Sequence, residues 1–158
     1  MKTRQTNRNR GGFTFAEIIV AGTTVSVLLS VFTPKFTATM DGLAVSHAAD
    51  EFVVAGQRAR VVAVHTGRTA QVRIDENRIW VEADTTRART GEKSVIGDVV
   101  DLADSGVTLE STVSSLCFDS RGIAPTRGSC AGSGGELEFS KGNSSKTVAV
   151  MATGFMLQ

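Results

Sequence analysis

The sequence predicts an α+β protein in which one long N-terminal helix packs on a C-terminal β-sandwich or on curved antiparallel sheets. Three features of the 158-residue chain lead to this prediction. An apolar run occupies 13–32, an amphipathic helical pattern follows it, and short alternating segments separated by turns fill the remainder. We therefore divide the chain into a head at 1–12, a membrane span at 13–34, a helical continuation at 35–67 and a β-rich globular domain at 68–158.

The apolar run has the length and composition of a transmembrane helix. Twenty residues at ~1.5 Å per residue cross the hydrocarbon core of a bilayer. Its single formal charge is Glu17. A carboxylate at mid-bilayer costs roughly 2.5–3.5 kcal/mol, so Glu17 is a candidate functional residue.

The distribution of charge around the span predicts its orientation. The head at 1–12 holds four basic residues and no acid, whereas Lys35 is the only cation between the span and Arg58. The positive-inside rule therefore predicts a cytoplasmic N-terminus and an exported C-terminal domain. An ordinary secretory signal and an uncleaved anchor are the alternatives. The long run, its acid and the lack of an A-x-A site fit a secretory signal poorly.

The residues around the start of the span resemble a known signal. Gly11-Gly12 followed by Phe13-Thr14-Phe15-Ala16-Glu17 closely resembles the class III signal of type IV pilins and of type II secretion pseudopilins. The resemblance implies that a prepilin peptidase cleaves between Gly12 and Phe13 and methylates the new N-terminus at Phe13. It also implies that Glu17 pairs with the N-terminal amine of a neighbouring subunit and sets the axial register of a filament, because opposite charges attract strongly at low dielectric. The alternative is that Glu17 stays unpaired and reaches the lipid headgroups.

Residues after the span predict that the helix continues. Pro34 matches a position at which the resembled family often has a proline, and a proline inside a helix kinks it. Beyond it, apolar residues recur at alternating spacings of three and four, with Gly67 as a C-cap. The residues of this stripe are Val45, Ala48, Phe52, Ala55, Ala59 and Val62.

From residue 69 the pattern changes to strands. The segments 69–74 and 79–83 alternate in polarity around a turn and predict a hairpin. Five further segments predict strands separated by turns: 95–102, 107–109, 113–118, 137–140 and 147–152.

Later motifs narrow the resemblance. A phenylalanine and a glycine at Phe118 and Gly122, followed by a glycine turn at Gly154, are similar to the H-type pseudopilin (GspH/FimT-like) family. The two cysteines, Cys117 and Cys130, lie on the exported side, where a disulfide is expected. Closing this loop would contribute about 3 kcal/mol in the chain-entropy model.

The sequence gives little support for an enzyme, a metal protein or a DNA-binding protein. No catalytic motif, cofactor motif or metal-binding cysteine pattern is present, and we expect the two histidines, His47 and His65, on the helix surface. The acids Asp98, Asp101 and Asp104 lack a calcium-loop pattern and predict a solvated edge. Without the head, 13 basic residues remain against 16 acidic ones, and the C-terminal tail has no cation, so nucleic acid is not a predicted partner.

We interpret the chain as a minor pseudopilin, a structural subunit of a type II secretion pseudopilus. The alternative is a type IV pilus minor pilin of the FimT-like kind, for pilus assembly, adhesion or DNA uptake. The resemblance implies three kinds of partner: a prepilin peptidase, other pseudopilins or pilins, and an inner-membrane assembly platform. The expected location is the bacterial inner membrane, in a single pass with a periplasmic C-terminal domain, and then a periplasmic or surface filament.

Overall fold

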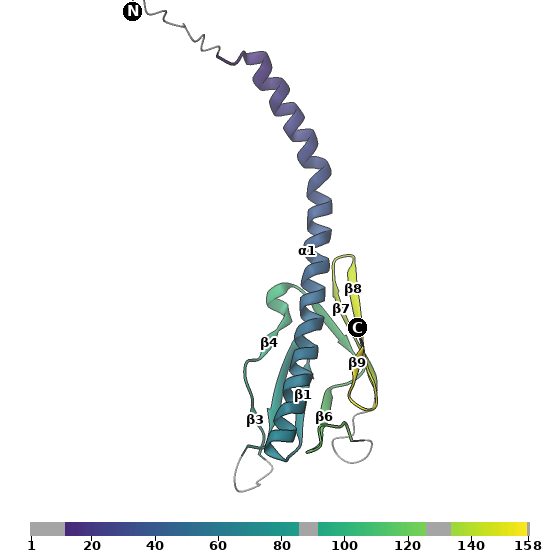
Figure 1. The fold of residues 1–158 in the computed structure, drawn as a ribbon. Helices are drawn as coiled ribbons and strands as arrows, with labels where there is room; N and C mark the ends of the chain where they lie inside the picture. Colours follow the sequence, from purple (N-terminus) through teal and green to yellow (C-terminus); the bar gives the residue numbers. More distant parts are fainter. Residues whose placement is uncertain (1–11, 86–91, 126–133, 158) are drawn as a thin grey trace, which may run out of the picture. The chain divides into compact units, whose positions relative to one another are not determined.

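The computed structural model describes residues 12–85, 92–125 and 134–157, with the side chains of 31–34 excepted. The chain divides into two compact units, Met1–Thr37 and Ala38–Gln158. The helix α1 spans Phe15–Thr66 and contributes to both units (Figure 1).

The first unit is an α1 segment that is apolar on every side. Each side chain described between residue 12 and Thr37 is exposed. The most apolar window of the helix has a mean hydropathy of 2.0, and the helix is long and apolar enough to cross a membrane. Its hydroxyls bond to carbonyls of the same helix, as Thr24 does to Val20 at 2.8 Å and Ser26 to Gly22 at 2.8 Å. These hydroxyl groups therefore need no water, which suits a lipid or helix-packed environment.

The second unit begins with an amphipathic α1 segment. Its buried residues follow a helical stripe: Val45, Ala48, Ala49, Phe52, Ala55, Ala59 and Ala63. The segment ends where Gly67 adopts a left-handed φ of 65°. The N–H of Arg68 donates to the carbonyl of Ala63 at 3.1 Å and the N–H of Gly67 to that of Val64 at 3.3 Å, which is a Schellman cap.

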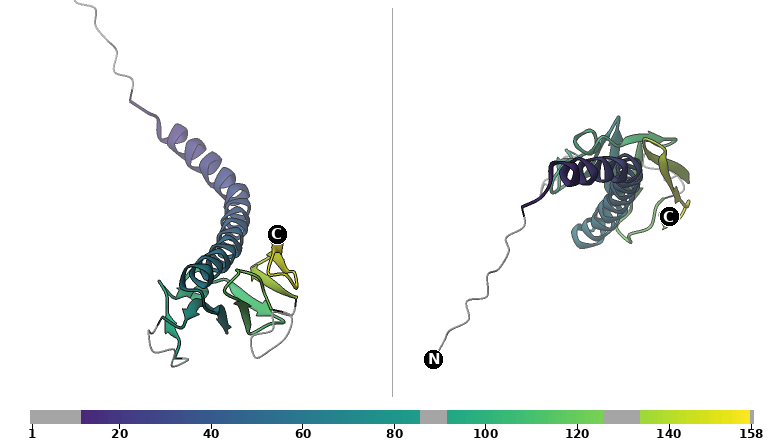
Figure 2. Two further views of the ribbon diagram at one scale, coloured as in Figure 1. Left: turned by 60° about the horizontal axis from the view of Figure 1, so that its bottom comes forward. Right: turned by 90° about the horizontal axis from the view of Figure 1, so that it is seen from above.

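Two antiparallel sheets pack against this helical segment. The first has the order β3-β2-β1-β6, with β4 also paired to β2; its strands are β1 Ala70–Asp75, β2 Arg78–Ala83, β3 Ser94–Val95, β4 Val100–Asp101 and β6 Ser115–Phe118. The second has the order β5-β7-β8-β9; its strands are β5 Thr108–Ser111, β7 Gly135–Lys141, β8 Ser144–Val150 and β9 Met156–Leu157. A short 3₁₀ helix, η1, spans Leu102–Ser105. Figure 2 shows the β1–β4 strands and the β7–β9 strands beside one another along the helix.

The turn between β1 and β2 connects the two sheets. Oδ1 of Asn77 accepts a hydrogen bond from the N–H of Leu109 in β5 at 3.0 Å, and the backbone carbonyl of Asn77 accepts one from the N–H of Leu102 in η1 at 2.8 Å. Asn77 thus satisfies one backbone donor at the edge of the second sheet and one at the start of η1.

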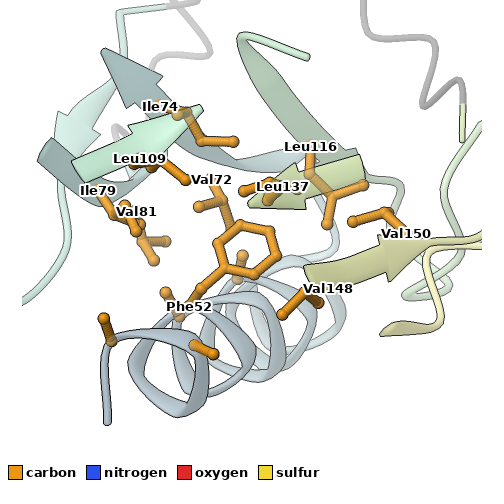
Figure 3. Close-up of a cluster of buried hydrophobic side chains, with 14 of the residues drawn as sticks. Phe52, Val72, Ile74, Ile79, Val81, Leu109, Leu116, Leu137, Val148 and Val150 are labelled. Carbon is orange, nitrogen blue, oxygen red and sulfur yellow. The ribbon is translucent and has the colours of Figure 1, made fainter. Parts of the chain in front are cut away.

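The core lies between α1 and both sheets, with Phe52 near its centre (Figure 3). Phe52 is fully buried, and its ring centroid lies 6.2 Å from that of Phe139 in a tilted arrangement. The alanines of the stripe are small, so the strands approach the helix closely on either side of this ring. The fold is the predicted one, a long helix on antiparallel sheets.

Two local predictions need correction, and one short strand was missed. The predicted strand at 95–102 is divided into β3 and β4, and Leu102 begins η1 instead. The stripe on α1 ends at the buried Ala63, whereas Val62 is only half-buried. The strand β9 was not predicted, because two residues provide no measurable alternation.

Candidate functional site

The candidate site is the first turn of α1. The hydroxyl of Thr14 accepts a hydrogen bond from the N–H of Glu17 at 3.3 Å, and Oε2 of Glu17 accepts one from the N–H of Thr14 at 3.4 Å. This reciprocal pair is a capping box. It satisfies two of the free donors at the helix start and places a negative charge where the helix dipole favours it.

Sequence reasoning identified Glu17 but missed Thr14. The signal was present, because a threonine three residues before a glutamate, immediately ahead of an apolar run, is typical of a helix N-terminus. Glu17 therefore has a role within its own chain, at the start of the helix, in addition to the intersubunit role that the resemblance implies.

An open apolar groove follows the same side of the helix. Phe13, Glu17, Ile18, Gly22 and Val25 are among the residues that line about 620 Å³ of space. Apart from the adjoining backbone of α1, no atom of the described residues comes within 4 Å of the position where Gly22 would carry a Cβ. A second apolar helix could approach the backbone closely there, with the Glu17 carboxylate at one end of the contact.

The remaining predicted site residues are distributed as follows. Gly12 is exposed and Phe13 is 81% exposed, so within the part of the chain that the structure describes no side chain covers the predicted cleavage point. Residue 34 belongs to α1, but the side chain of Pro34 lies outside the described residues. Cys117 is buried in β6, and Cys130 lies outside the described residues, so the disulfide stays a prediction.

The second unit leaves a further apolar face on α1 uncovered. Opposite the buried stripe, Leu43, Val54, Val61 and Val64 are each more than half exposed. Four large apolar side chains at helical spacing exceed the scattered exposure of an ordinary surface, so this face is a candidate contact surface for another subunit.

The family-like residues at the end of the chain form one cluster. The guanidinium of Arg60 lies 5.4 Å from the centre of the Phe118 ring and 4.9 Å from that of Phe155. Gly154 packs on the same Phe118 ring, and Gly122 packs on the stem of Arg60. The residues that carry the later part of the resemblance therefore lie in a cluster in which the C-terminal segment packs against Arg60 of α1.

The turn after β6 holds a carboxyl, that of Asp119, whose pKa is lowered. The N–H of Ile123 donates to Oδ1 of Asp119 at 3.1 Å and Arg121 bonds to the same carboxylate at 2.9 Å, which together lower the pKa of Asp119. Arg121 is therefore paired with Asp119 within its own turn.

The other candidates occupy surface positions. His47 and His65 are exposed on α1, and Asp98 and Asp104 are exposed near η1. Asp101 caps η1, because its carboxylate accepts a hydrogen bond from the N–H of Ala103 at 3.0 Å. Among the residues that the structure describes, no three His, Cys, Asp or Glu side chains are arranged to hold a metal ion.

Comparisons with known proteins identify the family. The model of the family described as type II transport protein GspH matches residues 48–154, more than half of the chain. A crystal structure of the type IV minor pilin FimU of Pseudomonas aeruginosa PAO1 is similar, with a TM-score of 0.51 and 14% identity over 72% of this chain and 86% of that one. A second crystal form of FimU matches with a TM-score of 0.43 and 15% identity over 71% of this chain and 90% of that one. The curated proteins contain no significant match. The long helix, the two antiparallel sheets and the family model agree, and the chain belongs to the GspH family of pilin-like structural subunits.

Proposed function

We propose that this pilin-like subunit is a minor pseudopilin of a type II secretion system. The observation that carries the proposal is the first turn of α1, where Glu17 and Thr14 form a capping box at the start of an exposed apolar helix. The chain that carries this turn belongs to the GspH family. An apolar helix of this kind needs either lipid or other helices around it. A subunit that moves from membrane to filament meets both environments in turn.

The N-terminus would be processed before assembly. The peptidase would remove the basic head at 1–12 from its cytoplasmic side and leave a methylated amine on Phe13. This amine would lie close to the Glu17 of an adjacent subunit, and the attraction between the two charges would offset part of the cost of removing each from water. Glu17 would then exchange its bond to Thr14 for the incoming amine and fix the axial position of the new subunit.

The two apolar faces of α1 would have separate roles. The segment up to Thr37 would pack among the corresponding helices of neighbours in the filament core. The exposed face of Leu43, Val54, Val61 and Val64 would contact neighbouring subunits beside the globular domain. A disulfide between Cys117 and Cys130 would hold the loop between them in the oxidising periplasm.

A secretion assay tests this proposal. A strain that lacks the gene should retain exoproteins in its periplasm, and the wild-type gene should restore their secretion. Glu17→Ala should fail to restore it, whereas Glu110→Ala, which changes an exposed carboxylate on β5, should succeed. Normal secretion without the gene would contradict the assignment.

A type IV pilus minor pilin is the second candidate. The likeness to FimU in fold favours it, although this likeness concerns only the fold. In that case secretion would continue without the gene, and surface pili would be lost. Electron microscopy of the same strains separates the two functions.

A further inference from the structure

The turn between β7 and β8 contacts α1 where the helix first meets the rest of the second unit (Figure 1). From residue 12 to Met40 every described side chain is exposed, whereas Asp41 is half-buried beside this turn and Val45 is the first fully buried residue of the helix. Asp41 and the turn both belong to the second unit. The turn is therefore the contact that supports the helix ahead of its buried stripe.

The backbone of the turn lies close to the helix. The φ of Gly142 is 57°, and a Cβ added to this glycine would lie 2.9 Å from Oδ2 of Asp41. A Cβ added to Gly42 in the helix would lie 3.7 Å from Oγ of Ser144. A glycine at 142 thus permits both the turn conformation and the close approach to Asp41.

Lys141 joins three elements at this turn. Its Nζ donates a hydrogen bond to the backbone carbonyl of Ser105 in η1 at 2.8 Å and lies 3.6 Å from Oδ1 of Asp41 in α1. The side chains of Asp41 and Lys141 are 28% and 32% exposed. Salt in the solvent therefore reaches this ion pair and weakens it.

The helix is intrinsically weak where Lys141 contacts it. Four residues between 37 and 42 have a low helix propensity, namely Thr37, Thr39, Asp41 and Gly42. The side chains of residues 38–40 are exposed, so no apolar burial stabilises the helix there. Because a helix without tertiary packing is marginal in water, its contacts with the turn decide whether this segment stays helical.

We propose that Lys141 is a latch on α1. While its ion pair and hydrogen bond are made, residues 38–44 stay helical; when they break, this segment unwinds and the core around Phe52 stays folded. Opening would let α1 bend ahead of the buried stripe without loss of the fold. The latch is a property of the chain itself, and only its use by a subunit that moves from membrane to filament rests on the proposed function.

Hydrogen exchange of the full-length chain in detergent tests the latch, because exchange of backbone amides reports local unwinding. Lys141→Met removes the charge and keeps the stem, and Asp41→Asn weakens the same pair from the helix side. The matched control is Lys146→Met, which removes the other ion pair from this hairpin to α1, between Lys146 and Asp50 at 3.9 Å. A charge exchange, Asp41→Lys with Lys141→Asp, rebuilds the ion pair in reverse.

We expect amides of 38–44 to exchange about fivefold or more faster in Lys141→Met, because a hydrogen bond from a charged group is lost together with an ion pair. Asp41→Asn should give a smaller increase, and the charge exchange should restore part of the protection. The control should leave 38–44 unchanged. Raising the salt to about 0.5 M should speed exchange of 38–44 in the wild type and have little effect in Lys141→Met.

Two results would overturn the latch. Unchanged exchange of 38–44 in both Lys141→Met and Asp41→Asn would show that the contact does not hold the helix. An equal increase across 38–44 and 52–63 would show that Lys141 stabilises the whole unit instead of one segment. Neither result bears on the secretion assay, so the latch and the proposed function fail separately.

Discussion

Alanine at Gly154 should destabilise the second unit more than alanine at Gly67. Both glycines have a left-handed backbone, with φ of 81° and 65°, which costs an L-residue roughly 1–2 kcal/mol. At Gly67 an added Cβ meets no atom within 4 Å, so backbone strain is the only cost. At Gly154 it would lie 2.8 Å from Cε1 of Phe118 and 3.1 Å from the Cβ of Ala124, both of them buried residues. Overpacking of this kind adds typically about 1–3 kcal/mol, so we expect about 2–5 kcal/mol for Gly154→Ala.

Thermal unfolding of the full-length chain in detergent measures the difference. Trp80 is the single tryptophan, and its Nε1 donates to Oε1 of Glu82 at 2.7 Å, so its fluorescence reports on the first sheet. For a unit of this size each kcal/mol lowers Tm by roughly 3–6 °C, which predicts about 3–12 °C for Gly67→Ala and about 6–30 °C for Gly154→Ala. Equal shifts in the two variants would refute the argument that Gly154 is required for close packing on Phe118.

Three further predictions use the same unfolding assay. Arg60→Met should cost about 1–2 kcal/mol, because it removes two cation–π contacts, while Arg60→Lys should cost less; equal losses would show that only the apolar stem matters. The lowered pKa of Asp119 means that its stabilising effect is present above the ordinary value of 3.8 and is lost as the pH falls through the folded value. Asp119→Asn should therefore destabilise the protein at neutral pH and lose its effect in strong acid; a cost that does not change with pH would contradict this cause. Reductant should reduce the free energy of unfolding of the wild type by about 3 kcal/mol and so lower its Tm, but it should not change the Tm of a Cys117→Ser, Cys130→Ser variant. An equal response of both proteins would exclude the disulfide.

Periodicity made most of the fold predictable from the sequence. The helical stripe around Phe52 has the spacing of a buried helix face, and the hairpin of β1 and β2 alternates cleanly across a polar turn. The prediction failed where segments are too short to show a period. The residues of 95–102 are divided between β3, β4 and η1, because both short strands pair with one edge of β2 and leave a bulge at Gly97.

The candidate site was predictable only in part. The position of Glu17 in the apolar run made it a candidate functional residue, whereas its bond to Thr14 required attention to the helix start as well as to the charge. A groove that lies between α1 and the first sheet could not be predicted, because its lining residues come from segments far apart in sequence that lie together only in the folded chain. The cluster of Arg60 with Phe118 and Phe155 depends in the same way on tertiary contacts.

The central claim is that the subunit enters a filament through its N-terminal helix, with Glu17 at the contact. The most direct measurement is the amount of tagged chain in sheared filaments, compared with the amount left in the membrane, for the wild type, Glu17→Ala and Glu110→Ala. We expect the wild type and Glu110→Ala to reach the filament fraction, while Glu17→Ala stays in the membrane at normal abundance. Incorporation of Glu17→Ala at the wild-type level would contradict it.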